Sequence, residues 1–300
     1  MFWTFLLLVI LGVDWASGYA IAGYVITHGV HPLGYAFWQS AGPLALLALV
    51  QLFRRDLGFY KSGVYYALFA AIFGIVIPNL LFYFVVQHVD SGVLTVIANV
   101  APIFTYPLAI IYAQESPSCK RFVAVIVGVV GVILLVSPLT FEHKIYLSNA
   151  WLYIALIIPV CYAFSAVFVA RFRPSEGNIL SYSFWMLLVS TILISPMTYF
   201  YYGYYPLKFG DSNTYLIVIE MLLSAFGYVL LFFIIKKAGP VYYMLVNAIT
   251  AMAGVIYGKI LFGQYISGKM YLGIFLILLA IIGLTYLQNN WHKRVVKNAL

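Results

Sequence analysis

The chain has 300 residues, of which 65% are hydrophobic and only 8% are charged. Soluble domains carry roughly a quarter charged residues, and a soluble protein of this length has too little interior to hide so much apolar surface. The composition therefore excludes a soluble globular protein and predicts a polytopic membrane protein. Cys119 and Cys161 lie far apart and indicate neither a disulfide framework nor a metal motif.

About 20 apolar residues cross a bilayer as an α-helix. This rule, together with charges and Gly/Pro clusters, predicts ten spans joined by short connectors. They are residues 3–26, 32–53, 63–87, 91–113, 121–139, 149–171, 178–201, 214–235, 240–261 and 270–289. The first span has no basic stretch before it and no clear cleavage site, so it is expected to be retained rather than removed as a signal peptide.

The net charge of +8 is distributed as a topology signal. Twelve of the 16 Lys and Arg residues follow even-numbered spans, and four follow odd-numbered spans. This positive-inside bias predicts that both termini are cytoplasmic. It also makes a basic face for nucleic acid a poor interpretation of the charge.

The two halves of the chain resemble each other. Residues 32–38 resemble 179–185, and residues 84–114 align with 233–263. We expect two five-span repeats, residues 1–145 and residues 146–300, the second ending in a short basic tail. Because five is odd, the second repeat enters the membrane from the opposite side, an arrangement typical of secondary transporters.

The fourth span carries a polar stripe. Over residues 93–114, side chains at spacings i, i+4, i+7 and i+11 share one helical face, and these are Thr95, Asn99, Pro102 and Tyr106. The counterpart stripe in the ninth span has Tyr243, Asn247, Thr250 and Gly254, with Ala251 opposite Pro102. We expect two unequal gates, with substrate contacts from Asn99 and Asn247; interhelical hydrogen bonding is the structural alternative.

Two carboxylates are predicted inside the membrane. Asp14 lies near the middle of the first span, and Glu220 lies in the eighth. A charged side chain at the bilayer centre costs roughly 2.5–3.5 kcal/mol, so such groups face the protein interior, pair or stay protonated. Both are candidates for proton coupling or cation binding. The alternatives are a structural carboxyl at Asp14 and an ion pair between Glu220 and Lys259.

Further candidates line the predicted inner spans. Asn79 follows Pro78, with Tyr83 one turn later, which suggests a hinge beside a substrate hydrogen bond or, alternatively, helix–helix contact. Aromatic side chains that could stack on an aromatic or cationic substrate, or simply pack, are Trp15, Tyr19, Trp38, Tyr162 and Trp185. The expected flexure points are Pro78, Pro102 and Pro240.

Enzyme chemistry has no visible basis in the sequence. There is no Gly-rich phosphate loop, no His-Glu-x-x-His motif and no Cys/His metal spacing. We therefore expect neither catalytic residues nor a cofactor or metal.

The chain resembles the EamA-type branch of the drug/metabolite transporter superfamily over essentially its whole length. The resemblance is carried by Gly12-Val13-Asp14-Trp15-Ala16-Ser17, by His31-Pro32-Leu33 leading into Phe37-Trp38-Gln39, by Asn99-Val100-Ala101-Pro102 with Gln114-Glu115, and by Gly128-Val129-Val130-Gly131. It implies a central cavity lined by spans 1–4 and 6–9, with spans 5 and 10 peripheral, and it adds Gln39 to the candidates. Asp14 and Gln264 depart from the family pattern.

The resulting hypothesis is a secondary-active, alternating-access transporter of small metabolites in a bacterial inner membrane. Amino acids or related amphipathic compounds are the expected substrates, and protons are the expected coupling ion. Uptake of an organic cation or nucleoside-like metabolite is the alternative, and a channel or membrane enzyme is a lesser one. The expected partners are the substrate and the lipid bilayer, and both a monomer and a homodimer are compatible with the sequence.

Overall fold

The structure is a computed structural model that describes residues 2–54, 63–112, 117–136, 146–172, 179–238, 243 and 246–298. Every regular element within these ranges is helical. In the first half they are α1 (Phe2–Thr27), α2 (Pro32–Arg54), α3 (Gly63–Ala71), the π-helix η1 (Ile72–Val76), α4 (Ile77–Val85), α5 (Ser91–Ala98), α6 (Ala101–Ile111) and α7 (Cys119–Val136). In the second half they are α8 (Tyr146–Ala155), α9 (Ile157–Phe172), α10 (Ile179–Phe200), α11 (Ser212–Ala238), α13 (Val246–Phe262) and α14 (Gly268–Asn298).

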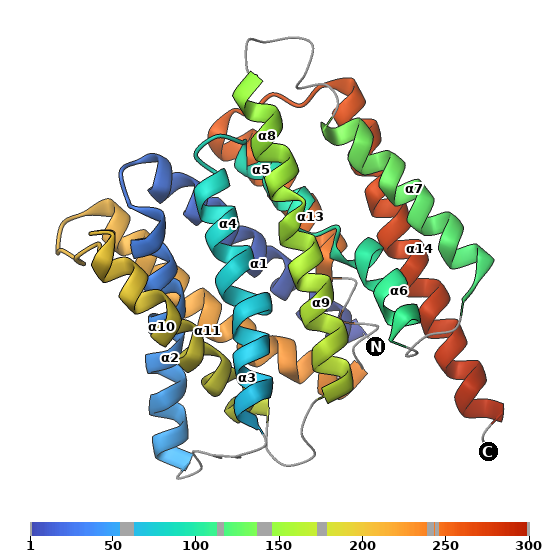
Figure 1. The fold of residues 1–300 in the computed structure, drawn as a ribbon, viewed down its shortest axis with the longest axis horizontal. Helices are drawn as coiled ribbons and strands as arrows, with labels where there is room; N and C mark the ends of the chain where they lie inside the picture. Colours follow the sequence, from blue (N-terminus) through green and yellow to red (C-terminus); the bar gives the residue numbers. More distant parts are fainter. Residues whose placement is uncertain are drawn as a thin grey trace.

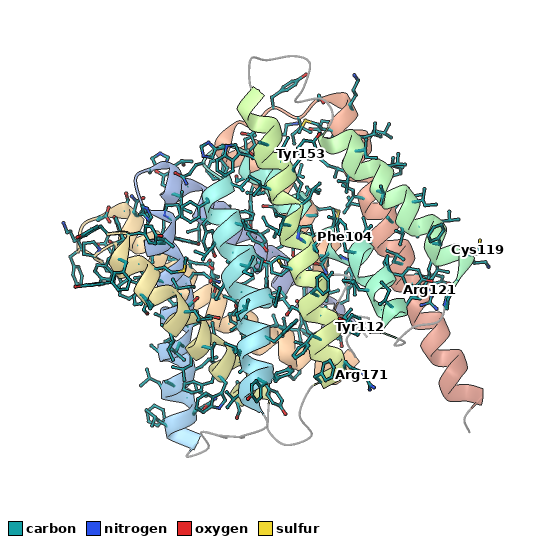
Figure 2. The ribbon with its side chains drawn as sticks, in the orientation of Figure 1. Phe104, Tyr112, Cys119, Arg121, Tyr153 and Arg171 are labelled. Carbon is teal, nitrogen blue, oxygen red and sulfur yellow. The ribbon has the colours of Figure 1, made fainter. Side chains whose placement is uncertain are left out.

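The helices have the length and composition of membrane spans. In the described part of the chain, seven helical segments are long and apolar enough to cross a bilayer, and the apolar segments Val246–Phe262 and Gly268–Leu284 are shorter. Each predicted span corresponds to one helix or to one broken helix. Figure 2 shows Tyr153 and Arg171 near opposite ends of the broken helix α8–α9. Arg171 is at the end that the positive-inside pattern assigns to the cytoplasm.

Within the described ranges, three spans are interrupted, each four residues before a proline. Pro102 follows the end of α5 at Ala98, Pro159 follows the end of α8 at Ala155, and Pro78 follows Gly74 in the π-helical turn. Proline has no backbone N–H for its i−4 carbonyl, and its ring collides with that carbonyl. The wide turn of η1 accommodates Pro78, and there Ile77 N–H donates to the Ile72 carbonyl five residues back.

The prediction of one continuous helix over residues 93–114 is wrong. The chain leaves the α-helix at Asn99 and Val100, so Thr95 lies on α5 and Tyr106 on α6. The predicted single stripe is therefore divided at its centre. The second half has Ala251 at the equivalent place, and α13 runs through it without a break.

The contacts between helices follow a pseudo-two-fold pattern (Figure 1). Helix α1 packs against α11 and α13, and its counterpart α9 packs against α4 and α6. Likewise α2 packs against α11, while its counterpart α10 packs against α3. Three pairs lie across the axis of this pattern, namely α2 with α10, α5 with α13, and α7 with α14.

Helices α7 and α14 form the edge of the bundle seen on the right of Figure 1. Their close approach depends on glycine. A Cβ at Gly131 would lie 2.8 Å from the carbonyl oxygen of Gly273 and 3.0 Å from the backbone nitrogen of Ile277. These are backbone atoms, so a larger residue at position 131 must push the helices apart.

Gly131→Ala is expected to lower the free energy of unfolding by about 1–2 kcal/mol relative to Gly283→Ala, because overpacking typically costs about 1–3 kcal/mol. Gly283 is the matched control, since its Cβ would meet only the Ala124 Cβ at 4.0 Å. Both changes gain the same helix propensity. Melting of the two purified variants in one detergent measures the difference, and equal melting temperatures would contradict the assignment of this contact.

Candidate functional site

Two carboxylates meet glycines where α1 crosses α11. The Asp14 side chain of α1 lies against Gly227 of α11, where an added Cβ would be 2.5 Å from Asp14 Oδ2. The Glu220 side chain of α11 lies against Gly18 of α1, where an added Cβ would be 2.9 Å from both carboxylate oxygens. Along α1, Asp14 comes before Gly18, but along α11 their respective partners come in the reverse order, Gly227 after Glu220. The two helices therefore cross antiparallel. We call Asp14 and Glu220 the acid pair.

Both members of the acid pair are buried. Asp14 is 8% exposed and Glu220 is 5% exposed. Glu220 Oε1 accepts a hydrogen bond of 2.7 Å from Ser224 Oγ. Within the described residues, Asp14 Oδ1, Glu220 Oε2 and the neighbouring Trp15 Nε1 have no hydrogen-bond partner. Buried polar atoms are rarely left unsatisfied, so these three atoms point to a site that takes up a further group.

A chain of hydrogen bonds leads from the acid pair across the bundle. Ser224 Oγ accepts from Gln39 Nε2 at 3.5 Å, and Gln39 Oε1 accepts from Asn79 Nδ2 at 3.2 Å. Asn79 Oδ1 accepts from the Tyr162 hydroxyl at 2.8 Å, and that hydroxyl lies 3.3 Å from the hydroxyl of Tyr19. These five residues and Glu220 form the polar network, which joins α11, α2, α4, α9 and α1.

Every assigned donor in the polar network points towards Glu220. Tyr162 donates to Asn79, Asn79 to Gln39, Gln39 to Ser224, and Ser224 to the carboxylate. Hydrogen bonds aligned in this way polarise one another and strengthen the terminal bond. The network therefore fixes one oxygen of Glu220 and leaves the other available.

Aromatic rings surround the acid pair and the polar network. Trp15 meets Tyr228 edge-on with ring centroids 5.9 Å apart, and Tyr35 meets Tyr83 edge-on at 4.8 Å. The Tyr19 ring stacks on Phe82 at 4.5 Å. The Tyr35 hydroxyl also donates to the Gly18 carbonyl at 3.2 Å, beside Glu220.

An ion pair between Glu220 and Lys259 is the sequence alternative that the structure contradicts. Lys259 is exposed and its Nζ donates to the Tyr271 hydroxyl at 3.4 Å. The Lys259 side chain leaves α13 towards α14 and not towards Glu220.

The structure brings together several of the predicted site residues. Those in the acid pair, in the polar network or in ring contact beside them are Asp14, Trp15, Tyr19, Gln39, Asn79, Tyr83, Tyr162 and Glu220. They come from α1, α2, α4, α9 and α11 and thus from both halves of the chain.

Other predicted residues lie apart from this cluster. Trp38 Nε1 donates to the Tyr205 carbonyl at 2.8 Å, and Trp185 packs edge-on against Phe184. Asn99 Nδ2 donates to the Thr95 carbonyl at 2.9 Å, an oxygen that also accepts the Asn99 backbone N–H at 3.2 Å.

The predicted residues of the ninth span are only partly placed. Tyr243 is half-buried and packs on the apolar cluster that contains Leu8 and Ile234, and Asn247 is half-buried in the first turn of α13. Pro240 lies outside the described residues, as do Gln114 and Glu115.

Sequence reasoning missed three residues of the site as candidates, namely Ser224, Tyr228 and Tyr35. Ser224 and Tyr228 follow Glu220 at i+4 and i+8, so helical spacing does place them on the face of Glu220, although they were not named as candidates. No comparable signal marks Tyr35, because it depends on how α2 packs on α1. Among the described residues no three His, Cys, Asp or Glu side chains gather as a metal site.

Comparison with known proteins identifies the family. The model of the EamA-like transporter family matches residues 2–137 and matches again at residues 149–286. The chain belongs to the EamA-like transporter family. It is a multi-pass membrane protein built from ten spans in two inverted five-helix repeats, and its family is one of transporters rather than of enzymes.

The fold is also that of a solved structure. A structure titled only "Crystal structure of protein" superposes with a TM-score of 0.65 at 13% sequence identity, covering 95% of this chain and 97% of that chain. At this identity the likeness shows the fold alone. A search of the curated proteins found no match.

A double-mutant cycle on Asn79→Ala and Tyr162→Phe is expected to give a coupling of about 1 kcal/mol, because each change removes the same buried hydrogen bond. Unfolding free energies of the purified variants measure it. Pairing Asn79→Ala with Tyr153→Phe provides the control, since Tyr153 is 63% exposed. A coupling no larger than that of the control pair would show that the polar network is not formed.

Proposed function

We propose that the protein is a secondary-active transporter that moves small amine-bearing metabolites, amino acids or related amphipathic compounds, by alternating access. Membership of a family of small-molecule transporters supports this proposal. The observation that carries the substrate class is the acid pair, where two buried carboxylates each keep an oxygen without a partner among the described residues. A substrate ammonium group would supply a positive charge to the carboxylates and hydrogen-bond donors to their unpartnered oxygens.

The two repeats, residues 1–145 and 146–300, would rock against each other around this site. The acid pair lies between α1 of the first repeat and α11 of the second, which suits a site that both halves control. Pro78 beside the π-helical turn and Pro102 beside the break at Asn99 are suitable points of flexure. Pro240 remains a hinge candidate on sequence grounds.

We further propose that the acid pair couples transport to protons. A carboxylate in this position is stable when it carries a proton or binds a cation, and exchange of the two is a coupling mechanism. Among the described residues, the titratable side chains around the pair are tyrosines, namely Tyr19, Tyr35, Tyr83, Tyr162, Tyr228, Tyr243 and Tyr257. We therefore propose that the carboxyl groups exchange the protons, since a tyrosine hydroxyl ordinarily has a pKa of about 10.

An organic cation is a second candidate substrate, favoured by the combination of carboxylates with aromatic rings. A zwitterionic amino acid needs a partner for its carboxylate as well, whereas an organic cation does not. This observation favours an organic cation over a nucleoside-like compound. A competition panel in proteoliposomes that compares amino acids, their decarboxylated amines and quaternary ammonium ions distinguishes the classes.

We place the protein in a bacterial inner membrane with both termini cytoplasmic. The support is the excess of Lys and Arg after even-numbered spans. Figure 1 is consistent with this topology, since α1 begins and α14 ends towards the same side of the bundle.

Asp14→Asn and Glu220→Gln are each expected to flatten the dependence of transport on pH, because an amide cannot release a proton. Initial uptake rates in proteoliposomes between pH 5.5 and 8.5, divided by the amount of reconstituted protein, measure the effect. Asp90→Asn is the control. Asp90 stands at the N-cap of α5 outside the spans, and burial raises the pKa of its carboxyl, so it is the competing source of a pH effect. Unchanged profiles in both span variants would refute proton coupling through the acid pair.

A further inference from the structure

Within the part of the chain that the structure describes, neither member of the acid pair has a basic side chain as its partner. No Lys, Arg or His occurs in α1. The Lys and Arg residues of the helices that pack around the pair stand near the ends of those helices, at Arg54, Arg171, Lys236, Lys237 and Lys259. Two buried carboxylates without a counter-ion are neutralised only by two positive charges. Two protons can supply them, as can one proton with a monocation, or a single dication.

The spacing of the pair selects among these cations. The Glu220 carboxylate lies level with Gly18, and Gly18 is four residues after Asp14 on the same helix. At 1.5 Å per residue this spacing is roughly 6 Å along α1, whereas Gly227, which faces Asp14, is seven residues after Glu220 on α11, roughly 10 Å. Over most of this range a cation held at about 2.8 Å by one carboxylate does not touch the other, so the pair is treated as two adjacent sites of charge −1 rather than one site of charge −2.

The free atoms and the surface between the carboxylates also suit an extended ligand. Asp14 Oδ1 and Glu220 Oε2 each lack a partner among the described residues. Beside Asp14 lie the Trp15 indole, whose ring meets Tyr228, and a methyl group of Leu11, which would be 3.6 Å from a Cβ at Gly227. Aromatic and alkyl surfaces pack against methylene groups, and the aromatic faces also favour an ammonium group.

We propose that the acid pair binds a linear diamine with four or five methylene groups between its two ammonium groups, one on Asp14 and the other on Glu220. This rests on the proposed function and names its substrate more closely. The nitrogen atoms of such a chain are roughly 6–7.5 Å apart when each bond advances about 1.25 Å. The shortest diamines reach both carboxylates only at the smaller of the two separations, and much longer ones must fold between them.

The test uses purified full-length protein in proteoliposomes. Inhibition of amine uptake is measured with diamines of two to eight methylenes, and with the monoamine of equal length as the matched compound. We expect tightest inhibition at four or five methylenes, at least tenfold tighter than by the corresponding monoamine. Asp14→Asn and Glu220→Gln should each reduce this advantage to less than threefold, whereas the control Asp90→Asn should keep it.

The outcomes separate this inference from the proposed function. Inhibition by monoamines or amino acids with no optimum in diamine length overturns the diamine site and leaves the transporter proposal standing. A diamine advantage that survives in both span variants also overturns the assignment to the acid pair. If the wild type shows no counterflow with any amine or amino acid, both proposals are overturned. The melting curve of each variant shows whether it is folded. Where a variant is not folded, the dependence of wild-type inhibition on diamine length still tests the diamine site.

Discussion

The contact between a carboxylate and a glycine, made twice where α1 crosses α11, constrains the rest of this structure. A carboxylate in the interior of a membrane protein needs space and neighbours, and the facing helix provides both by carrying no side chain at that level. Asp14 with Gly227 and Glu220 with Gly18 thus form two interlocking units. The residues at these four positions are not independent, since a methyl group at either glycine would displace the carboxylate opposite.

The polar network extends this constraint from one helix crossing to both repeats. Its contacts between Gln39 and Ser224, between Asn79 and Tyr162, and between Tyr19 and Tyr162 join residues of different halves. An average neutral hydrogen bond contributes only about 0.5–1.5 kcal/mol net. Such links hold one arrangement of the halves without making it permanent, which suits the proposed alternating access.

The sequence predicted the helices well and the faces of the helices less well. Span positions follow from the lengths of the hydrophobic stretches, which can be read directly along the sequence. The structure confirms these positions within a few residues. Asp14 and Glu220 could be singled out because a charge in the membrane is costly in any context. Their glycine partners could not, because those depend on how two distant helices cross.

The wrong predictions have related causes. The alternative of an ion pair between Glu220 and Lys259 failed because the direction of a side chain follows from packing and not from its position in the sequence. The stripe through Asn99 assumed an unbroken helix, although Pro102 was already visible four residues after Ala98. For Trp38, which the sequence left open to substrate stacking or to packing, the structure adds a hydrogen bond from its indole N–H to the Tyr205 carbonyl on another segment.

The difference between Pro102 and Ala251 has a consequence for how a carrier of this design works. The fourth span is jointed, whereas its counterpart α13 is a single rod through the equivalent position. The two halves are therefore not mechanically equivalent at this point. Under the proposed alternating access, opening towards the two compartments would require different work and the empty carrier would rest mainly on one side. Each 1.4 kcal/mol of that bias would make the half-saturating substrate concentrations at the two membrane faces differ by a further factor of about ten.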